Sequence, residues 1–365
     1  VTMKIPELKI GELTAKMPVV QGGMGVRVSL SSLASAVANE GGIGTISSIG
    51  LGQTEASKEK FEQICREALT VEIRKAKQMT TGLLAVNIMG VLSNAKDLVK
   101  TSVREGIKII FFGAGLPTKL PLWVNDSSVN LVPIISSARA AELILRLWDK
   151  RYGRTVDGFV LEGPLAGGHL GFSESELEHL ESCSLEKLLP EVLKSIRFFE
   201  AKYEKKIPVI AAGGIFDGED IARMLSIGAS GVQMGTRFVC TTECDVSQQF
   251  KQAYLDAQEE DIVIVKSPVG LPGRAIRNKF LKMLEINGRQ KVKCHFRCLT
   301  ACKVGEAKYC IARALVNSFL GNVDNGLIFC GQNAYRINEI ISVKELFRML
   351  ANELTEKHIP EFQFA

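Results

Sequence analysis

Short apolar runs rich in β-branched residues alternate with longer segments of helical spacing along the first two thirds of the chain. Eight runs predict strands: Pro18–Gln21, Gly42–Ile46, Leu83–Asn87, Ile107–Phe112, Asn130–Ile135, Gly158–Glu162, Pro208–Ala212 and Gly231–Met234. Most are nearly uniform apolar runs rather than alternations of apolar and polar residues, as expected of parallel strands buried on both faces. Six segments between them predict helices: Ser29–Asn39, Glu55–Lys77, Ala95–Glu105, Ala138–Lys150, Leu185–Lys202 and Asp217–Ile227.

Strands that alternate with helices indicate βαβ units and a parallel sheet. Eight such units predict a closed (β/α)8 TIM barrel, with an open doubly wound sheet as the structural alternative. Glycines favour the barrel, because they cluster where the candidate strands end: Gly22-Gly23, Gly50, Gly90, Gly113, Gly167-Gly168, Gly213-Gly214 and Gly235. In a barrel these ends all lie on one face, where active sites sit.

The strand–helix rhythm is lost after residue 240, which predicts a C-terminal, cysteine-containing helical extension. We expect a barrel over residues 1–245, an appendage with a basic and cysteine-rich segment over 246–340, and a closing helix and tail over 341–365. The closing helix is predicted at Val343–Glu356, because four apolar residues share one helical face: Leu346, Met349, Leu350 and Leu354.

Composition narrows the classes of function. The chain has 365 residues, 46% hydrophobic and 23% charged, which are ordinary globular values, and its net charge of +5 is too small to indicate a nucleic-acid partner. No apolar run reaches the roughly 18 residues of a membrane span, and the N-terminus lacks the layout of a signal peptide. Nine cysteines then favour thiols or metal ligands over disulfides, and we expect a cytoplasmic protein without a membrane partner.

Two glycine-containing loops, at the ends of the seventh and eighth candidate strands, predict a phosphate site. Gly213, Gly214 and Gly235 would offer backbone N–H groups to the phosphate, and Thr236 would add a hydroxyl. The chain has neither the Gly-x-Gly-x-x-Gly pattern of a dinucleotide-binding module nor an ATP-type phosphate loop. A mononucleotide cofactor at the mouth of the barrel therefore fits better.

A histidine in a glycine-rich loop after the sixth candidate strand is the candidate catalytic residue. His169 follows Gly167 and Gly168, and these glycines let the loop fold tightly against a flat ligand. An imidazole can transfer protons near neutral pH. The alternative, a structural histidine bonded to backbone, is less favoured because the loop belongs to the face where active sites sit.

At this point the chain resembles a known family, the nitronate monooxygenases. The resemblance rests on seven motifs: Gln21–Gly25, Gly42–Gly44, Val86–Asn87, Ala166–Gly171, Ala212–Ile215, Met234–Phe238 and Gly270–Asn278. The flavin-dependent enoyl-acyl-carrier-protein reductases of type II share the same motifs. The resemblance therefore identifies the superfamily over roughly residues 15–280 and does not separate its members.

The resemblance implies an FMN-binding barrel whose catalytic residue is His169. Backbone along the flavin ring would come from the first loop, and Asn87 would hydrogen-bond the ring. Glu162 would contact the ribityl chain or the ring. The remaining implied contacts, with the ring and then the phosphate, are Gly22, Gly23, Met24, Gly167 and Gly168, followed by Gly213, Gly214, Gly235 and Thr236.

Two enzymatic functions and one binding function stay open at this point. An FMN-dependent nitronate monooxygenase would oxidise a small-molecule nitronate with O2 by way of the flavin. An enoyl-acyl-carrier-protein reductase would use NAD(P)H and FMN, with an acyl carrier protein as partner. A non-catalytic sensor of a phosphate ligand would not need His169 in its glycine loop, which counts against it. A homodimer is left open.

The cysteine segment departs from the family pattern. Cys294, Cys298, Cys302 and Cys310 have the number of thiols that zinc or an iron–sulfur cluster requires, and the first three would share one face of a helix. Their spacing matches no common motif, so free cysteines packed in a helical appendage are the alternative. Twelve Lys and Arg residues between Lys266 and Arg313 form either a solvated face or a docking surface for an acidic partner.

Overall fold

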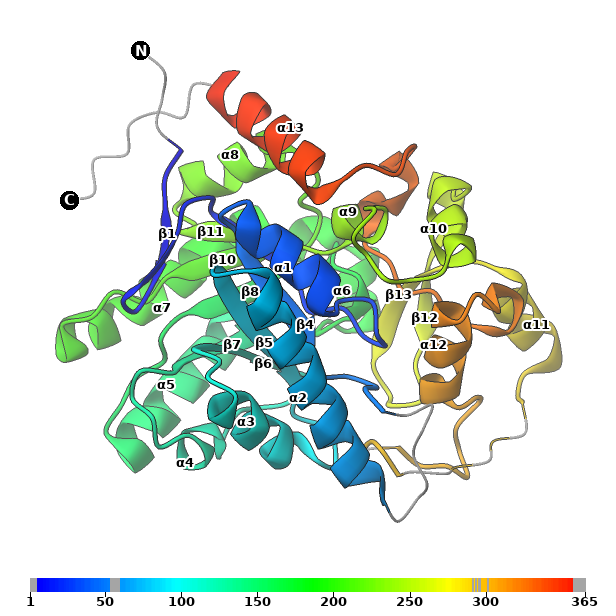
Figure 1. The fold of residues 1–365 in the computed structure, drawn as a ribbon, viewed down its shortest axis with the longest axis horizontal. Helices are drawn as coiled ribbons and strands as arrows, with labels where there is room; N and C mark the ends of the chain where they lie inside the picture. The colour runs from blue at the N-terminus through cyan, green and yellow to red at the C-terminus, as the bar shows by residue number, and fades with distance from the viewer. Residues whose placement is uncertain are drawn as a thin grey trace.

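Eight parallel strands close into a barrel at the centre of the computed structural model (Figure 1). The structure describes residues 5–52, 60–290, 292, 294, 297–300 and 302–356. The barrel strands, in chain order, are β3 (Val19–Gln21), β4 (Ile43–Ser47), β5 (Leu83–Met89), β6 (Ile109–Gly113), β7 (Asn130–Ile135), β8 (Phe159–Glu162), β10 (Val209–Ala212) and β11 (Gly231–Met234). All eight predicted strands are present, and β11 pairs with β3 to complete the ring. The closed barrel is therefore confirmed over the open sheet.

Helices cover the outside of the barrel, as buried parallel strands require. They are α1 (Ser31–Asn39), α2 (Phe61–Met79), α3 (Ala95–Arg104), α4 (Leu120–Trp123), α5 (Ala138–Tyr152), α7 (Leu185–Tyr203) and α8 (Gly218–Ile227). Two short helices, α6 (Glu174–Glu178) and α9 (Thr236–Val239), belong to the segments that follow β8 and β11. The short helices α4, α6 and α9 were not predicted. The predicted start of the second helix, at Glu55, falls outside the described residues, and α2 begins at Phe61.

A hairpin at the N-terminus fills the end of the barrel opposite the glycine loops. Its strands are β1 (Leu8–Ile10) and β2 (Leu13–Ala15). Leu8 and Ile10 are fully buried in one cluster with inward-facing residues of the barrel strands, including Val20 and Ile210. The hairpin packs where the barrel strands start, since Leu8 lies against Gly231.

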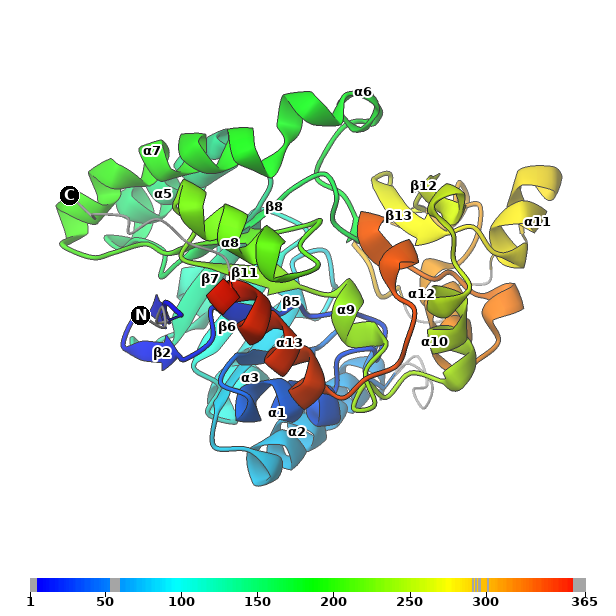
Figure 2. The ribbon, with the colours of Figure 1, turned by 90° about the horizontal axis from the view of Figure 1, so that it is seen from above.

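The C-terminal extension contains a sheet as well as helices, so its description as helical was incomplete. Strands β12 (Ile262–Lys266) and β13 (Pro272–Ile276) form an antiparallel pair, and β13 also pairs with β9 (Gly168–His169) of the barrel loop. Helices α10 (Gln248–Leu255), α11 (Lys279–Asn287) and α12 (Ile311–Phe319) lie around this sheet, on one side of the barrel (Figures 1 and 2).

The last helix returns from the extension to the barrel wall. Helix α13 (Val343–Glu356) packs against α1 and α8 and so completes the ring of helices (Figure 2). Of the predicted apolar face, Leu346, Leu350 and Leu354 are buried, together with Val343 and Phe347, while Met349 is only half-buried. Among the described residues, no helix combines the length and the apolar character that crossing a bilayer would demand.

Candidate active site

One cavity of about 740 Å³ opens at the carboxyl ends of the barrel strands, beneath the extension. Its size is that of a site for a cofactor and a small ligand. The lining includes every residue that the sequence predicted for the cofactor or for catalysis: Gly22, Gly23, Met24, Asn87, Glu162, Gly167, Gly168, His169, Gly213, Gly214, Gly235 and Thr236. The fold thus brings together residues from five different strand ends.

The loop after β3 is held by a buried side-chain network. Gln21 Nε2 donates to Ser29 Oγ (2.9 Å), and Gln21 Oε1 accepts from the N–H of Thr45 (3.0 Å). The Ser29 hydroxyl accepts in turn from the N–H of Met24 (2.8 Å). Both side chains are fully buried, so the loop backbone around Gly22 has one fixed path. Ser29 explains why α1 begins two residues later than predicted: its hydroxyl bonds to the loop.

Small residues in this loop allow a close approach to polar side chains of other strands. A Cβ atom on Gly23 would lie 2.2 Å from Cβ of Asn87, and one on Gly22 would lie 3.3 Å from Cγ of Gln233. Among the described residues, none hydrogen-bonds to the side chains of Asn87, Gln233 or Glu162, although all three line the cavity. Polar groups placed in this way are available to a polar ligand. Gln233, on β11, was not singled out from the sequence.

Glu162 is the only acidic side chain that lines the cavity within the described part of the chain. Burial raises the pKa of its carboxyl to about 7, because no nearby positive charge or hydrogen-bond donor stabilises the ionised form. The carboxyl therefore changes protonation state around neutral pH. A raised pKa of this kind in a cavity is typical of functional sites.

The two loops of the predicted phosphate site lie side by side. Gly213 and Gly214 have φ angles of +97° and +81°, and a Cβ atom on Gly213 would lie 2.9 Å from the backbone N of Ala166. Thr236 Oγ accepts a hydrogen bond from the N–H of Gly331 (2.9 Å), which leaves its own proton to donate. Only glycine fits the 213 position, because both its backbone conformation and its surroundings exclude a side chain.

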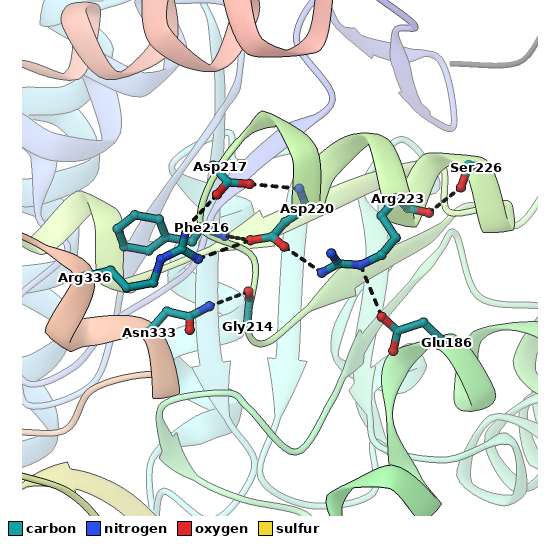
Figure 3. A network of polar contacts seen from close by, with 9 residues as sticks. All are labelled: Glu186, Gly214, Phe216, Asp217, Asp220, Arg223, Ser226, Asn333 and Arg336. Atoms are coloured by element: carbon teal, nitrogen blue, oxygen red, sulfur yellow. Dashed lines mark hydrogen bonds and ion pairs between the residues drawn. The ribbon is translucent and has the colours of Figure 1, made fainter. Parts of the chain in front are cut away.

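The extension supports the loop after β10 (Figure 3). Asn333 Nδ2 donates to the carbonyl of Gly214 (2.8 Å). Arg336 pairs with Asp217 (2.7 Å), and its guanidinium lies over the ring of Phe216 at 4.1 Å. Asp217 also caps α8 by accepting from the N–H of Asp220. No pattern in the sequence indicated the contacts of Asn333 and Arg336, because each joins residues 119 positions apart.

His169 lies at the junction of the barrel and the extension. Its backbone pairs with Gly273 of β13, and its Nε2 atom lies 2.7 Å from Oγ of the buried Ser267. The ring packs edge-on against Phe329, with centroids 5.2 Å apart. Burial lowers the pKa of the imidazole to about 4, so His169 is neutral at physiological pH. Neither Ser267 nor Phe329 was predicted.

A buried arginine holds the loop that carries this histidine. Arg274 Nη1 donates to the carbonyls of Pro164 and Ala166, both at 2.6 Å. Burial lowers the pKa of its guanidinium to about 10, and the side chain is almost fully enclosed. Arg274 belongs to the Gly270–Asn278 motif, which was recognised in the sequence. The contact of Arg274 with the histidine loop was not predicted.

The cysteine segment meets the cavity at Cys298 and Leu299. Cys298 lines the cavity, and its carbonyl accepts from the N–H of Ser93 in the β5–α3 loop. The described residues at Cys294, Cys298 and Cys302 are not helical, so the shared helical face does not exist. Within the described residues, no three His, Cys, Asp or Glu side chains are arranged to hold a metal. Metal binding by Cys294, Cys298, Cys302 and Cys310 stays a prediction.

Comparison with known proteins places these features in a family. The family model described as nitronate monooxygenase matches residues 7–353. A dehydrogenase of Mycobacterium tuberculosis, named for a 5-hydroxy-7a-methyl-1-oxo-octahydro-indene-4-carboxyl-CoA substrate, is 32% identical over 274 residues, or 75% of this chain and 67% of that protein. A probable nitronate monooxygenase of Staphylococcus saprophyticus is 28% identical over 306 residues, or 76% of this chain and 81% of that protein.

Solved structures agree with this assignment. FabK from Thermotoga maritima superimposes with a TM-score of 0.71 at 29% identity and covers 93% of each chain. A nitroalkane oxidase from Streptomyces ansochromogenes has the same fold, with a TM-score of 0.71 at 20% identity over 93% of this chain and 96% of its own. Because the family model spans nearly the whole described chain, this protein belongs to the nitronate monooxygenase family and is an enzyme of the flavin oxidoreductase type.

Proposed function

We propose that this protein is an FMN-dependent oxidoreductase of the nitronate monooxygenase type, which oxidises nitronates with O2 by way of the flavin. The observation that carries the proposal is the placement of His169, neutral and half-buried, in the same cavity as the glycine loops and the unpaired polar side chains. Flavin dependence is general in the family to which the chain belongs. The cavity thus contains both the glycine loops that would bind the cofactor and a histidine that can accept a proton.

The residues present fit FMN. Gly22, Gly23 and Met24 line the cavity and would lie along the ring. Position 23 requires glycine, because a Cβ atom there would collide with Asn87. Among the described residues no Lys or Arg lines the cavity, so the phosphate would be held by uncharged donors of the Gly213-Gly214 and Gly235-Thr236 loops. When bound, FMN supplies the electron acceptor for oxidation of the substrate carbon.

His169 would act on the proton of the substrate. With Ser267 donating to Nε2, the imidazole proton sits on Nδ1, where it can hydrogen-bond a substrate oxygen. With the opposite tautomer, the free nitrogen can accept the proton from a neutral nitroalkane. A nitronate is already an anion and needs no such step, so His169 would then serve to orient it. The low pKa of His169 keeps it unprotonated before substrate binds.

The test is direct. Purified protein should be yellow and should release FMN, not FAD, on denaturation. Under anaerobic conditions an alkyl nitronate should bleach the visible flavin absorption, and oxygen should restore it. Protein that carries no flavin and cannot be reconstituted with FMN would contradict the proposed FMN dependence and with it the proposed function.

A second function is favoured by one observation, the likeness to FabK over 93% of both chains at 29% identity. In this alternative NAD(P)H reduces the flavin, and the substrate is an enoyl thioester carried by an acyl carrier protein. The same anaerobic measurement of flavin absorption distinguishes the two functions. Bleaching by NADH or NADPH, followed by recovery on addition of an enoyl thioester, would select the reductase. Bleaching by the nitronate with no response to either nicotinamide would select the monooxygenase.

A further inference from the structure

A short segment of the C-terminal extension contacts both loops of the proposed phosphate site. We call it the support segment: Gly331–Arg336. The N–H of Gly331 donates to Thr236 Oγ (2.9 Å), and Asn333 Nδ2 donates to the carbonyl of Gly214 (2.8 Å). The two loops follow β10 and β11, which are neighbours in the barrel. One segment, distant in sequence, therefore holds both loops.

The last residue of the support segment, Arg336, attaches it to the loop after β10 (Figure 3). Its Nη2 atom pairs with Asp217 Oδ2 at 2.7 Å, and its Nη1 atom lies 3.9 Å from Asp220 Oδ2. The guanidinium also lies over the ring of Phe216, with Cζ 4.1 Å from the ring centroid. Because Phe216 and Asp217 come two and three residues after Gly214, Arg336 contacts the chain just beyond the glycines.

The ring of Phe216 also connects the two loops to each other. The guanidinium of Arg237, the residue after Thr236, lies over this ring at 4.4 Å from its centroid. Phe216 is buried, and its N–H donates to Asp220 Oδ2 (2.8 Å). A guanidinium is attracted to the face of an aromatic ring. Two guanidiniums, from α9 and from the support segment, therefore fix this ring relative to both loops.

The glycine loops need support from elsewhere in the chain. Gly213 and Gly214 have positive φ angles and no side chains to pack, and glycine loses more conformational freedom on ordering than any other residue. Among the described residues no Lys or Arg lines the cavity, so backbone N–H groups would have to hold the phosphate. Such donors bind an anion well only if they already point toward it, because ordering them on binding lowers the affinity.

Resting on the FMN dependence proposed above, we infer that Arg336 and Asn333 are positioning residues that pre-form the phosphate site of the flavin. Arg336 does not line the cavity, so it acts through the loop that it holds. The support segment then determines how much the phosphate group adds to the affinity for the flavin. Global stability depends on Arg336 much less, because its side chain is 36% exposed and ion pairs at such sites stabilise a fold little.

Riboflavin, which lacks the phosphate, distinguishes this role from a merely structural one. Full-length protein freed of FMN is titrated with FMN and with riboflavin, and the flavin fluorescence gives both Kd values. Arg336→Met should weaken FMN binding about 10-fold, which corresponds to about 1.4 kcal/mol, and should leave the Kd of riboflavin unchanged. Asn333→Ala removes one hydrogen bond to the loop and should act in the same direction. Equal losses for both flavins, or no loss for either, would overturn the inference.

Arg223→Met is the matched control (Figure 3). Arg223 also pairs with Asp220 (2.6 Å), and its side chain is 46% exposed, but its other partner is Glu186 of α7 rather than the support segment. The ratio of the two Kd values should therefore equal that of the unsubstituted protein. Melting temperatures of the flavin-free proteins check folding, and if Arg336→Met does not fold, Asn333→Ala decides.

The outcomes separate this inference from the proposed function. If the unsubstituted protein binds neither flavin, the proposed function fails and the inference falls with it. If the unsubstituted protein binds FMN and the ratio of the two Kd values is the same in Arg336→Met, only the inference fails.

Discussion

His169 and Ser267 form a hydrogen bond of 2.7 Å between residues 98 positions apart, one in a barrel loop and one at the end of β12. The bond uses Nε2 of the imidazole, so it determines which ring nitrogen remains for the substrate. The buried Ser267 is itself fixed by the turn that joins β12 to β13, where its carbonyl accepts from the N–H of Gly270. The extension thus takes part in setting the state of the candidate catalytic residue.

Ser267→Ala should therefore lower turnover about 10-fold while FMN stays bound, since about 1.4 kcal/mol of orientation of the imidazole is lost. Ser267→Thr keeps the hydroxyl and should recover most of the activity. The measurements are kcat and flavin content for the three proteins. Full activity in Ser267→Ala would show that the hydrogen bond has no part in the reaction.

His169→Asn tests the histidine itself. On neutral nitroalkanes the variant should lose about 10²–10⁴-fold in turnover, the usual contribution of a positioned base, while on preformed nitronates the loss should be smaller. In the unsubstituted enzyme, the acid limb of kcat/KM for nitroalkanes should lie near pH 4, because burial lowers the pKa of His169 to about 4. An acid limb at the ordinary histidine value would show that the free enzyme does not bury this ring as described.

Glu162 makes stability depend on pH with a definite sign. Its pKa is raised to about 7 in the folded protein from an ordinary value of 4.5, so the folded state holds the extra proton between these two values. Stability that comes from the protonated carboxyl is lost as pH rises through about 7. Glu162→Gln removes this dependence, and its melting temperature relative to the unsubstituted chain should rise between about pH 4.5 and 7. A constant difference across this range would mean that Glu162 is ionised throughout.

The enclosed guanidinium of Arg274 should be essential for the histidine loop. Arg274→Met leaves two loop carbonyls without a donor and should cost about 3 kcal/mol in the free energy of unfolding. Arg277→Met, three residues later, is the matched control, because Arg277 is exposed and pairs with Glu285 at the surface; its cost should stay below about 1 kcal/mol. Urea unfolding of both variants makes the comparison. Equal losses would show that Arg274 is no more important than a surface residue.

The four cysteines of the extension are tested by elemental analysis. If Cys294, Cys298, Cys302 and Cys310 bind a metal, anaerobically purified protein should contain iron with sulfide, or zinc, at a stoichiometric level. Cys298→Ser should remove the metal, whereas Cys183→Ser, at a buried thiol remote in sequence, should not. Absence of both metals from the anaerobic protein would make the four residues ordinary thiols.

The barrel could be predicted from sequence because its signals are local. A run such as Pro208–Ala212 is apolar by itself, and glycines at strand ends mark the active face without knowledge of the pairing. The first hairpin was missed since β1 and β2 have only three residues each and are buried by the barrel rather than by their own pattern.

The supporting contacts of the site could not be predicted for a different reason. Ser267, Phe329 and Asn333 belong to no motif that the sequence shows. They support the site only through contacts with residues far away in the chain. The cysteine segment shows the opposite error: regular spacing at Cys294 and Cys298 suggested a helix, but the described residues there are irregular and dock on the β5–α3 loop. Long-range packing overrides a local pattern in both cases.

The N-terminal hairpin closes the end of the barrel at which the strands begin. With Leu8 and Ile10 filling the lower end, cofactor and substrate have to come and go by way of the opposite opening, beneath the extension. Because FMN and a substrate would share this opening, a bound substrate should hinder the departure of FMN. We expect saturating alkyl nitronate to slow the loss of FMN on dilution, so that FMN dissociates more slowly from the enzyme with substrate than from the enzyme without it.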